Sequence, residues 1–263
     1  MSLRVRLSRG TIIDFKSPQV LADGLRWLVV GESGSGKSSC VASIAAQVIA
    51  GGEQVVVLDP HAEYADLWSV DPAVVVRVGY GGQCVEEDDI PQLLDLITSG
   101  SSVLLDLSHW MLHPQEMDAF VLTFVRALFD LRIKHPRFTL LVVEEAQTFA
   151  PQAQMQGQNN NVLTWVQLLT AGRKYGLGVV LASQRISLVD SNVVSNCNAR
   201  VFLRLSEVRD WKRARQYIPE EMGMTYETLR HFRSGEALIL TRWTPESRVQ
   251  LLLPGTQMRK AAL

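Results

Sequence analysis

Short apolar runs alternate along the chain with longer segments in which apolar residues recur every three or four positions. The short runs are rich in β-branched residues, and they occupy positions 25–30, 54–58, 74–78, 102–107, 138–143, 178–182 and 200–205. Because their apolarity is continuous rather than alternating, these runs predict strands that are covered on both faces of a sheet.

The longer segments at positions 37–50, 114–134 and 162–174 have the apolar spacing of amphipathic helices. Helices that alternate with buried strands cover the two faces of a parallel sheet. The pattern therefore predicts an α/β fold of three layers, with a mostly parallel sheet in the middle.

Both ends of the chain carry strand-like pieces with turn signals, at positions 1–24 and from Ser234 to the end. They predict small edge strands or hairpins. The length of 263 residues suits one large core and is too short for two. We expect a single domain over 1–263, with an N-terminal β extension at 1–24, the core at 25–205, and C-terminal helices and edge strands at 206–263.

Composition limits the partners and the compartment. Lys and Arg number 26 against 27 for Asp and Glu, so any contact with nucleic acid must be local. The cysteines Cys40, Cys84 and Cys197 are widely spaced, which suggests neither a disulfide framework nor a zinc site. The start of the chain lacks a signal-peptide pattern, and charges interrupt every long apolar run. We expect a cytoplasmic protein without a membrane partner.

The segment from Gly31 to Ser38 reads Gly-Glu-Ser-Gly-Ser-Gly-Lys-Ser, between a predicted strand and a predicted helix. This is the full context of a Walker A loop, in which backbone N–H groups and a helix N-terminus hold phosphates. Lys37 would contact the β- and γ-phosphates, and Ser38 would bind Mg²⁺. The expected cofactors are ATP and Mg²⁺. The expected nucleotide-binding residues are Gly31, Ser33, Gly34, Ser35, Gly36, Lys37, Ser38 and Ser39.

Two carboxylates, Glu144 and Glu145, end a predicted buried strand. A Walker B site needs one acid for the Mg²⁺ shell and another for the attacking water. We assign Glu144 to the metal, largely through water, and Glu145 to orienting and deprotonating the nucleophilic water.

Another acid, Asp59, closes the strand at 54–58 and precedes Pro60 and His61. It has two interpretations, a supporting role in the metal shell or the start of a turn. His61 fits a turn residue better than a catalyst.

Gln184 follows a predicted strand, where its amide could hydrogen-bond the γ-phosphate or the attacking water. Just before that strand, Arg173 and Lys174 stand at a predicted helix end, which the helix dipole alone would favour. The functional interpretation is an arginine finger, a cation that a neighbouring subunit supplies to the transferring phosphoryl group. Arg173 is the first choice, and Arg185 and Arg204 are the alternatives.

Several motifs together resemble the HerA/FtsK superfamily of P-loop motors, and HerA-like ATPases in particular. They are Leu-Asp-Pro-His-Ala-Glu-Tyr at 58–64, Val-Glu-Glu-Ala-Gln-Thr-Phe-Ala-Pro at 143–151, Ala-Gly-Arg-Lys-Tyr-Gly at 171–176, Ala-Ser-Gln-Arg at 182–185 and Ser-Asn-Cys-Asn-Ala-Arg at 195–200. The resemblance implies a RecA-like core whose sensor strand lies between the P-loop strand and the Walker B strand. It also implies the roles given above for Gln184 and Arg173.

The same resemblance implies a hexameric ring that threads DNA through its pore, sometimes beside a nuclease partner. HerA-like proteins usually begin with a β-barrel domain, whereas 30 residues precede Gly31, so we expect the motor core without the barrel. One alternative is a viral or phage genome-packaging ATPase, which would have a capsid partner. Another is a nucleotide-gated assembly or regulatory protein with little turnover.

The polar stretch at 152–161 cannot bury an apolar face and is predicted to be a loop. This loop and the arginine-rich stretch at 204–215 are the two candidates for touching DNA. Acidic residues interrupt the second stretch, so a solvated helix face is the alternative interpretation. His109 and His113 have helical spacing, but Pro114 and the lack of a following glutamate argue for structural roles.

Overall fold

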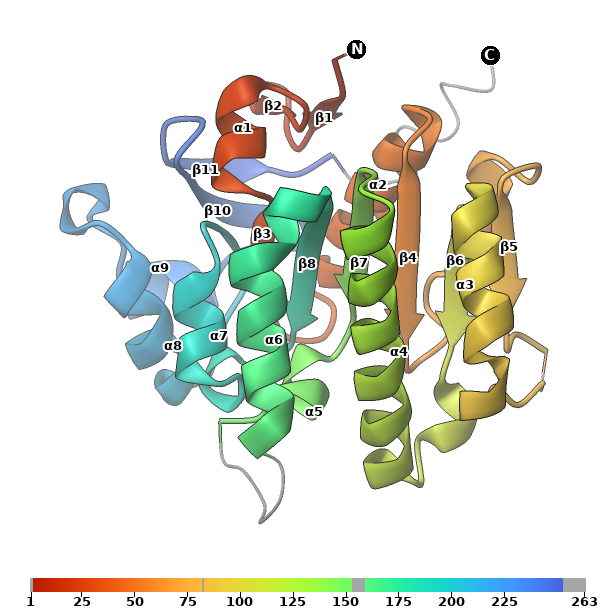
Figure 1. Cartoon of the computed structure of the whole chain (residues 1–263). Coiled ribbons are helices and arrows are strands. Elements are labelled where there is room, and N and C mark those ends of the chain that lie inside the picture. Colours follow the sequence, from red (N-terminus) through yellow and green to blue (C-terminus); the bar gives the residue numbers. More distant parts are fainter. Residues whose placement is uncertain (1, 82, 153–158, 253–263) are drawn as a thin grey trace.

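The computed structural model describes residues 2–81, 83–152 and 159–252. Within them, the main sheet has the strand order β11-β10-β9-β3-β8-β7-β4-β6-β5 (Figure 1). Its strands are β3 (Arg26–Val30), β4 (Gln54–Asp59), β5 (Val75–Val78), β6 (Ser102–Asp106), β7 (Thr139–Val143), β8 (Leu177–Ser183), β9 (Ala199–Phe202), β10 (Glu236–Thr241) and β11 (Ser247–Gln250). The strands from β3 to β9 pair in parallel, and β10 and β11 add an antiparallel edge. The predicted mostly parallel sheet is confirmed.

Helices cover both faces of this sheet. They are α1 (Pro18–Asp23), α2 (Lys37–Ala50), α3 (Ile90–Ser99), α4 (Pro114–Lys134), α5 (Ala146–Phe149), α6 (Asn159–Ala171), α7 (Ser191–Asn196), α8 (Val208–Ala214) and α9 (Tyr226–Arg230). In Figure 1, α3, α4 and α6 lie across one face of the sheet. Leu28 of β3 packs into the core with these helices, whereas its neighbour Trp27 packs into a second core with α2. Each central strand thus supplies both cores, which explains its continuous apolarity and confirms the three-layer fold.

The parallel register brings the carboxyl ends of the central strands to one edge. Val30 pairs with Ser183, and Leu58 pairs with Val143. Residues that directly follow β3, β7 and β8 therefore meet at this edge, where open α/β sheets place their ligands. The strand β8 lies between β3 and β7, as the resemblance implied for a sensor strand.

The N-terminal segment differs from the prediction of β structure alone. The short strands β1 (Arg4–Arg6) and β2 (Ile12–Asp14) pair with each other in a separate two-stranded sheet, and α1 follows them. Ser17 caps α1 by accepting a hydrogen bond from the Val20 amide, and Pro18 occupies the first turn. Such a start favours a helix, but six residues are too few for a helical apolar period to be recognised.

The polar stretch at 152–161 was also predicted wrongly in part. The helix α6 already begins at Asn159, whereas residues 153–158 lie outside the described part of the chain. At its other end, α6 stops at Ala171, and a 3₁₀ turn over Gly172–Tyr175 replaces the expected last helical turn. The turn signal at Pro254-Gly255 also lies outside the described residues.

A buried polar pair joins α4 to α6. Asp118 and Asn161 are each 8% exposed, and the Asn161 amide donates to the Asp118 carboxylate. Burial raises the pKa of Asp118 from 3.8 to about 6, and the hydrogen bond from Asn161 opposes part of that shift. Because the folded state has the higher pKa, stability falls as the pH rises from about 4 to about 6.

Asp118→Asn is therefore expected to stabilise the fold at about pH 7.5, by at most about 3 kcal/mol, since each pKa unit corresponds to about 1.4 kcal/mol. Urea unfolding at about pH 4 and about pH 7.5 measures the difference. The gain should be mostly lost at the lower pH, where Asp118 is protonated in the folded state and close to half protonated in the unfolded state. Asp130→Asn, exposed on the same helix, is the control. A variant that loses stability at the higher pH would show that the carboxylate stabilises the helix pair.

Candidate functional site

The loop between β3 and α2 curls through two left-handed glycines. Gly34 has a φ of 73° and Gly36 a φ of 100°, which other residues adopt at a cost. A Cβ atom on Gly36 would also lie 3.1 Å from the amide nitrogen of Gly235. Both positions therefore require glycine, and the loop leads directly into the N-terminus of a 14-residue helix.

This loop borders a hollow of about 260 Å³. Most of the predicted nucleotide-binding residues line it, namely Ser33, Gly34, Gly36, Lys37, Ser38 and Ser39. Gly31 and Ser35 lie beneath the loop instead. A Cβ on Gly31 would come within 2.8 Å of the Leu203 side chain, and the Ser35 carbonyl accepts from the Gly235 amide at 2.8 Å. These two residues support the shape of the loop rather than face the hollow.

Lys37, which lines the hollow, contacts the first acid of the predicted pair. The Lys37 ammonium forms an ion pair with Glu144, and both side chains are almost completely buried. The Tyr64 hydroxyl donates to the other carboxylate oxygen of Glu144. Burial lowers the pKa of Lys37, while Glu145, Glu63 and Asp59 oppose that shift. Burial also raises the pKa of Tyr64, which keeps its hydroxyl a hydrogen-bond donor.

The second acid faces a different set of partners. Glu145 has a φ of 53°, a left-handed conformation that bulky residues adopt mainly at functional sites. Its carboxylate accepts from the amide of Gln184 at 2.7 Å and from the amide of Gln147. The His61 ring nitrogen lies 3.9 Å from the same carboxylate. The two adjacent acids thus have separate environments, as their different predicted roles require.

Asp59 is occupied by hydrogen bonds from its own loop and from Tyr80. It accepts from the backbone amides of Glu63 and Tyr64 at 3.0 and 2.9 Å, and from the Tyr80 hydroxyl at 2.7 Å. Burial raises its pKa against these hydrogen bonds. This arrangement favours the turn interpretation of Asp59. The turn carries Ala62 at a φ of 55° and presents Glu63 to the hollow.

Tyr64, Glu63 and Ser234 were not predicted as site residues, although all three touch the hollow or its acids. The motif at 58–64 was the available signal for the first two, and it was used only for the resemblance. Ser234 arrives from the far end of the chain, and only a turn signal marked it in the sequence.

The donor types around the hollow fit a magnesium-bound nucleoside triphosphate. Backbone amides of the glycine-rich loop, the Lys37 ammonium and the start of α2 suit phosphate oxygens. The Ser38 hydroxyl and the Glu144 carboxylate are oxygen ligands of the kind that Mg²⁺ prefers. The residues present are therefore those that would hold ATP and Mg²⁺.

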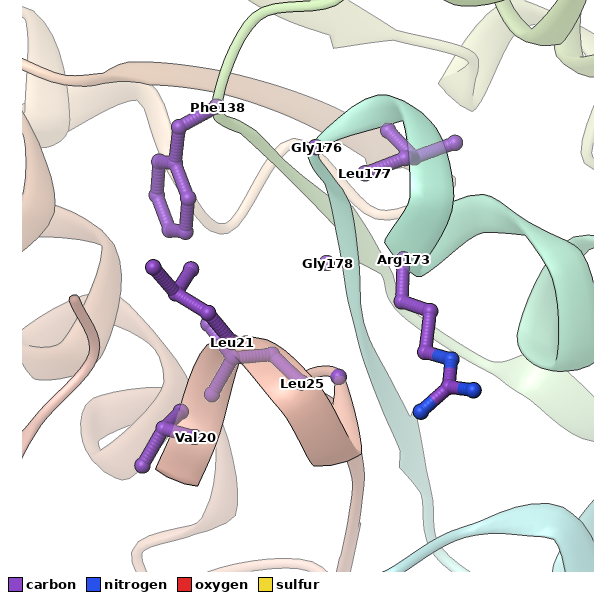
Figure 2. Close-up of a pocket in the computed structure, with 9 residues that line it drawn as sticks. Val20, Leu21, Leu25, Phe138, Arg173, Gly176, Leu177 and Gly178 are labelled. Atoms are coloured by element: carbon purple, nitrogen blue, oxygen red, sulfur yellow. The ribbon is translucent and has the colours of Figure 1, made fainter. Parts of the chain in front are cut away.

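Arg173 lies at the opposite edge of the sheet, because it precedes β8 instead of following it. Its guanidinium donates to the carbonyl oxygen of Ala22, next to the end of α1. Figure 2 shows Arg173 at a small pocket with Leu21, Leu25 and Phe138. Arg173 does not belong to the hollow of its own chain, which is the placement that a residue acting on a neighbouring subunit would need.

The two alternative arginines lie near the carboxyl edge but have acidic partners. Arg185 donates to Asp210 at 2.8 Å, and Asp210 also accepts from the Ser187 amide at 2.9 Å. Arg204 pairs with Glu32 of the phosphate loop. Both side chains are thus held within their own chain.

The arginine-rich stretch at 204–215 divides between several neighbours. Besides Arg204, Arg213 donates to Gln152 at 3.4 Å, whereas Arg209 and Arg215 are exposed. Trp211 packs against the core, as the solvated-helix interpretation requires. Among the described residues, no helix combines the length and the apolarity needed to cross a bilayer.

Two family models match overlapping parts of the chain. A model described as the central domain of helicase HerA matches residues 25–127, and one described as zonular occludens toxin (Zot) matches residues 86–208. Together they include the phosphate loop, the acidic pair and Gln184.

The curated relatives are helicases from archaea. The DNA double-strand break repair helicase HerA of Pyrococcus furiosus is 32% identical over 84 residues, which are 31% of this chain and 15% of that protein. HerA of Saccharolobus solfataricus is 31% identical over 146 residues, which are 49% of this chain and 27% of that protein. The matched stretches span less than a third of either relative.

Solved structures show the same fold at low identity. The genome packaging NTPase of Sulfolobus turreted icosahedral virus 2, in complex with ATP-gammaS, is 18% identical with a TM-score of 0.62, covering 88% of this chain and 99% of that one. The bacterial conjugative coupling protein TrwB is 11% identical with a TM-score of 0.68, covering 95% and 88%.

Proposed function

Since the chain is a HerA/FtsK-type P-loop ATPase, we propose that it hydrolyses ATP with Mg²⁺ to translocate or unwind DNA as a ring of identical subunits. The observation that carries the proposal is that Lys37 and Gln184 line one hollow beside the glycine-rich loop. Lys37 contacts Glu144 there, and Gln184 contacts Glu145. The archaeal helicases that match this chain act on DNA by their names, which supports the choice of cargo.

Each residue of the hollow has a chemical task in this proposal. Lys37 neutralises charge on the β- and γ-phosphates, while Ser38 and Glu144 hold Mg²⁺, which itself offsets the charge that develops on the phosphoryl group. Glu145 accepts the proton of the attacking water, and Gln184 fixes the orientation of the Glu145 carboxylate through their 2.7 Å hydrogen bond. Loss of the γ-phosphate would change the hydrogen bonds of Gln184, and this change would be transmitted to the strand β8 that precedes it.

Arg173 completes the site of the next subunit in the ring. The hollow and Arg173 lie at opposite edges of the same sheet, so a head-to-tail contact between copies would bring them together. An arginine supplied in this way stabilises the charge of the transition state. Hydrolysis would then depend on assembly.

The test is steady-state ATP turnover with Mg²⁺, with and without single- and double-stranded DNA, while particle mass is followed. We expect DNA to stimulate turnover in a multimeric particle and Arg173→Ala to abolish it. Mixing Arg173→Ala with Lys37→Ala chains should restore about a quarter of the sites, because a random ring pairs an intact hollow with an intact arginine at that frequency.

Lys174→Ala is the matched control, since Lys174 is an exposed cation in the same turn. It should keep the stimulated rate. DNA-indifferent hydrolysis by a monomer would overturn the motor proposal, and a mixture as inactive as its two components would overturn the role of Arg173 between subunits.

A packaging function is the second candidate, and the structural comparison favours it in one respect. The viral genome packaging NTPase is matched over 99% of its own length, so its fold has the extent of this chain. A packaging motor would use the same hollow and the same arginine. Stimulation by double-stranded DNA alone, without unwinding of a duplex, would favour packaging over the helicase function.

A further inference from the structure

The segment that follows β9 lies against one side of the phosphate loop. The Glu32 amide donates to the Arg204 carbonyl at 3.0 Å, and the Leu203 amide donates to Val30 at 2.8 Å. On the other side of the loop, the Gly31 amide donates to the carbonyl of Ser183, next to Gln184. The first half of the loop is therefore fixed between β8 and residues 203–206.

Glu32 and Arg204 form an ion pair on this side. The Arg204 Nε donates to one carboxylate oxygen of Glu32, and the Ser206 amide donates to the other at 3.1 Å. Burial alone would raise the pKa of Glu32, but the hydrogen bonds from Ser206 and Arg204 hold it below its usual range. Glu32 is thus a carboxylate at neutral pH, and it fixes the direction of the guanidinium through Nε.

The rest of that guanidinium points to the phosphate loop. A Cβ atom on Gly34 would lie 3.9 Å from Nη2 of Arg204. Gly34 lines the hollow three residues before Lys37, in the half of the loop that adjoins β8 and Gln184. Phosphates near this half are the terminal ones, because the start of α2 and Ser39 lie toward the nucleoside end.

We propose that Arg204 is a nucleotide-binding residue that contacts the terminal phosphates of ATP held by its own chain, with Glu32 as the residue that positions it. The inference rests on the proposed ATP binding and adds a cation in cis to the one that Arg173 would supply in trans. An arginine suits this double contact, because its fork of five N–H donors can bind a carboxylate through Nε and a phosphate through the Nη groups.

The experiment is equilibrium titration of the whole chain with fluorescent ATP-gammaS and fluorescent ADP in Mg²⁺. Arg204→Gln is expected to weaken ATP-gammaS binding by about ten- to a hundredfold, as loss of a charge-assisted hydrogen bond does, and ADP binding by less than about threefold. Arg204→Lys should fall between, since lysine keeps the charge but lacks the fork.

The variant Glu32→Gln tests whether the ion pair positions Arg204 for the nucleotide or only stabilises the phosphate loop. Glutamine keeps one oxygen that can accept from the Arg204 Nε, but it carries no charge that competes with phosphate, so ATP-gammaS should bind at least as tightly as to the unmodified chain. If Glu32→Gln and Arg204→Gln each weakened ADP binding as much as ATP-gammaS binding, the proposal would be overturned, because the ion pair would then serve only the loop.

Arg230→Gln is the matched control, because Arg230 pairs with Glu227 at 3.3 Å on the exposed helix α9. It should leave both affinities unchanged. If the unmodified chain fails to bind ATP-gammaS, the proposed ATPase function fails. If it binds and Arg204→Gln binds equally well, only the role of Arg204 is wrong.

Discussion

Glu145→Gln is expected to lower ATP turnover by about a hundred- to ten-thousandfold while ATP remains bound, because an amide cannot take the proton of the attacking water. Glutamine has nearly the same shape, and its amide oxygen can still accept from Gln184, so the hollow should keep its geometry. Multiple-turnover hydrolysis and titration with labelled ATP, made on the same sample, measure the two effects separately.

The neighbouring acid does not replace Glu145 in this scheme. Glu144 is paired with Lys37 and accepts from Tyr64, whereas Gln184 and His61 lie against Glu145. Two acids line the hollow itself, and because Glu32 is paired with Arg204, Glu63 is the one that could act on a water. Wild-type turnover by Glu145→Gln would contradict the assignment and would transfer the role of base to Glu63.

An exposed acid provides the control for this substitution. Glu116 on α4 is 65% exposed and lies 3.9 Å from the His113 ring, far along the chain from the hollow. Glu116→Gln removes one negative charge as well, and it should leave turnover and affinity unchanged. If Glu116→Gln lowered turnover as Glu145→Gln does, the cause would be the change in net charge and not the loss of proton transfer.

Regular elements with a strong local signal could be predicted from the sequence. The helix α2 starts at Lys37 because Gly36 is left-handed, and α4 starts at Pro114 because proline suits the first turn. Both helices have the predicted bounds, because the apolar spacing continues to their ends. The polar residues after β7 and β8 meet at one edge because a parallel register brings strand ends together.

Contacts between distant segments could not be predicted in this way. Tyr64 reaches Glu144 across 80 residues, and Arg204 reaches Glu32 across 172. The apolar spacing of the sequence cannot predict either contact, because the strand order of the sheet decides which loops become neighbours. Arg204 was considered as a cation for another subunit and as part of a stretch that could touch DNA, whereas the pairing of the preceding strand β9 with β3 brings it beside its own phosphate loop.

The position of Arg173 could be predicted from the sequence only in part. Its place before β8 puts it at the amino edge of any parallel sheet, which the sequence already implies. Its hydrogen bond to Ala22 depends on α1, which the sequence did not reveal. The assignment of Arg173 to a neighbouring subunit remains a proposal that the mixing experiment tests.

Lys37→Ala is expected to weaken ATP binding by more than about a hundredfold. The substitution removes the cation that would meet the β- and γ-phosphates. It also leaves Glu144, which is 0% exposed, without its ion pair. A carboxylate in that position repels the phosphates, so the loss should exceed that of a single hydrogen bond.

The same substitution also lowers the free energy of unfolding, because an unpaired buried carboxylate costs about 3–5 kcal/mol unless it is protonated. The double variant Lys37→Ala with Glu144→Gln distinguishes the two effects, since glutamine is neutral and still accepts from Tyr64. Unfolding in urea should show that the double variant regains stability, while titration with labelled ATP should show that binding stays lost. Recovery of binding along with stability would mean that Lys37 mainly neutralises Glu144, and the phosphate contact assigned to it would be wrong.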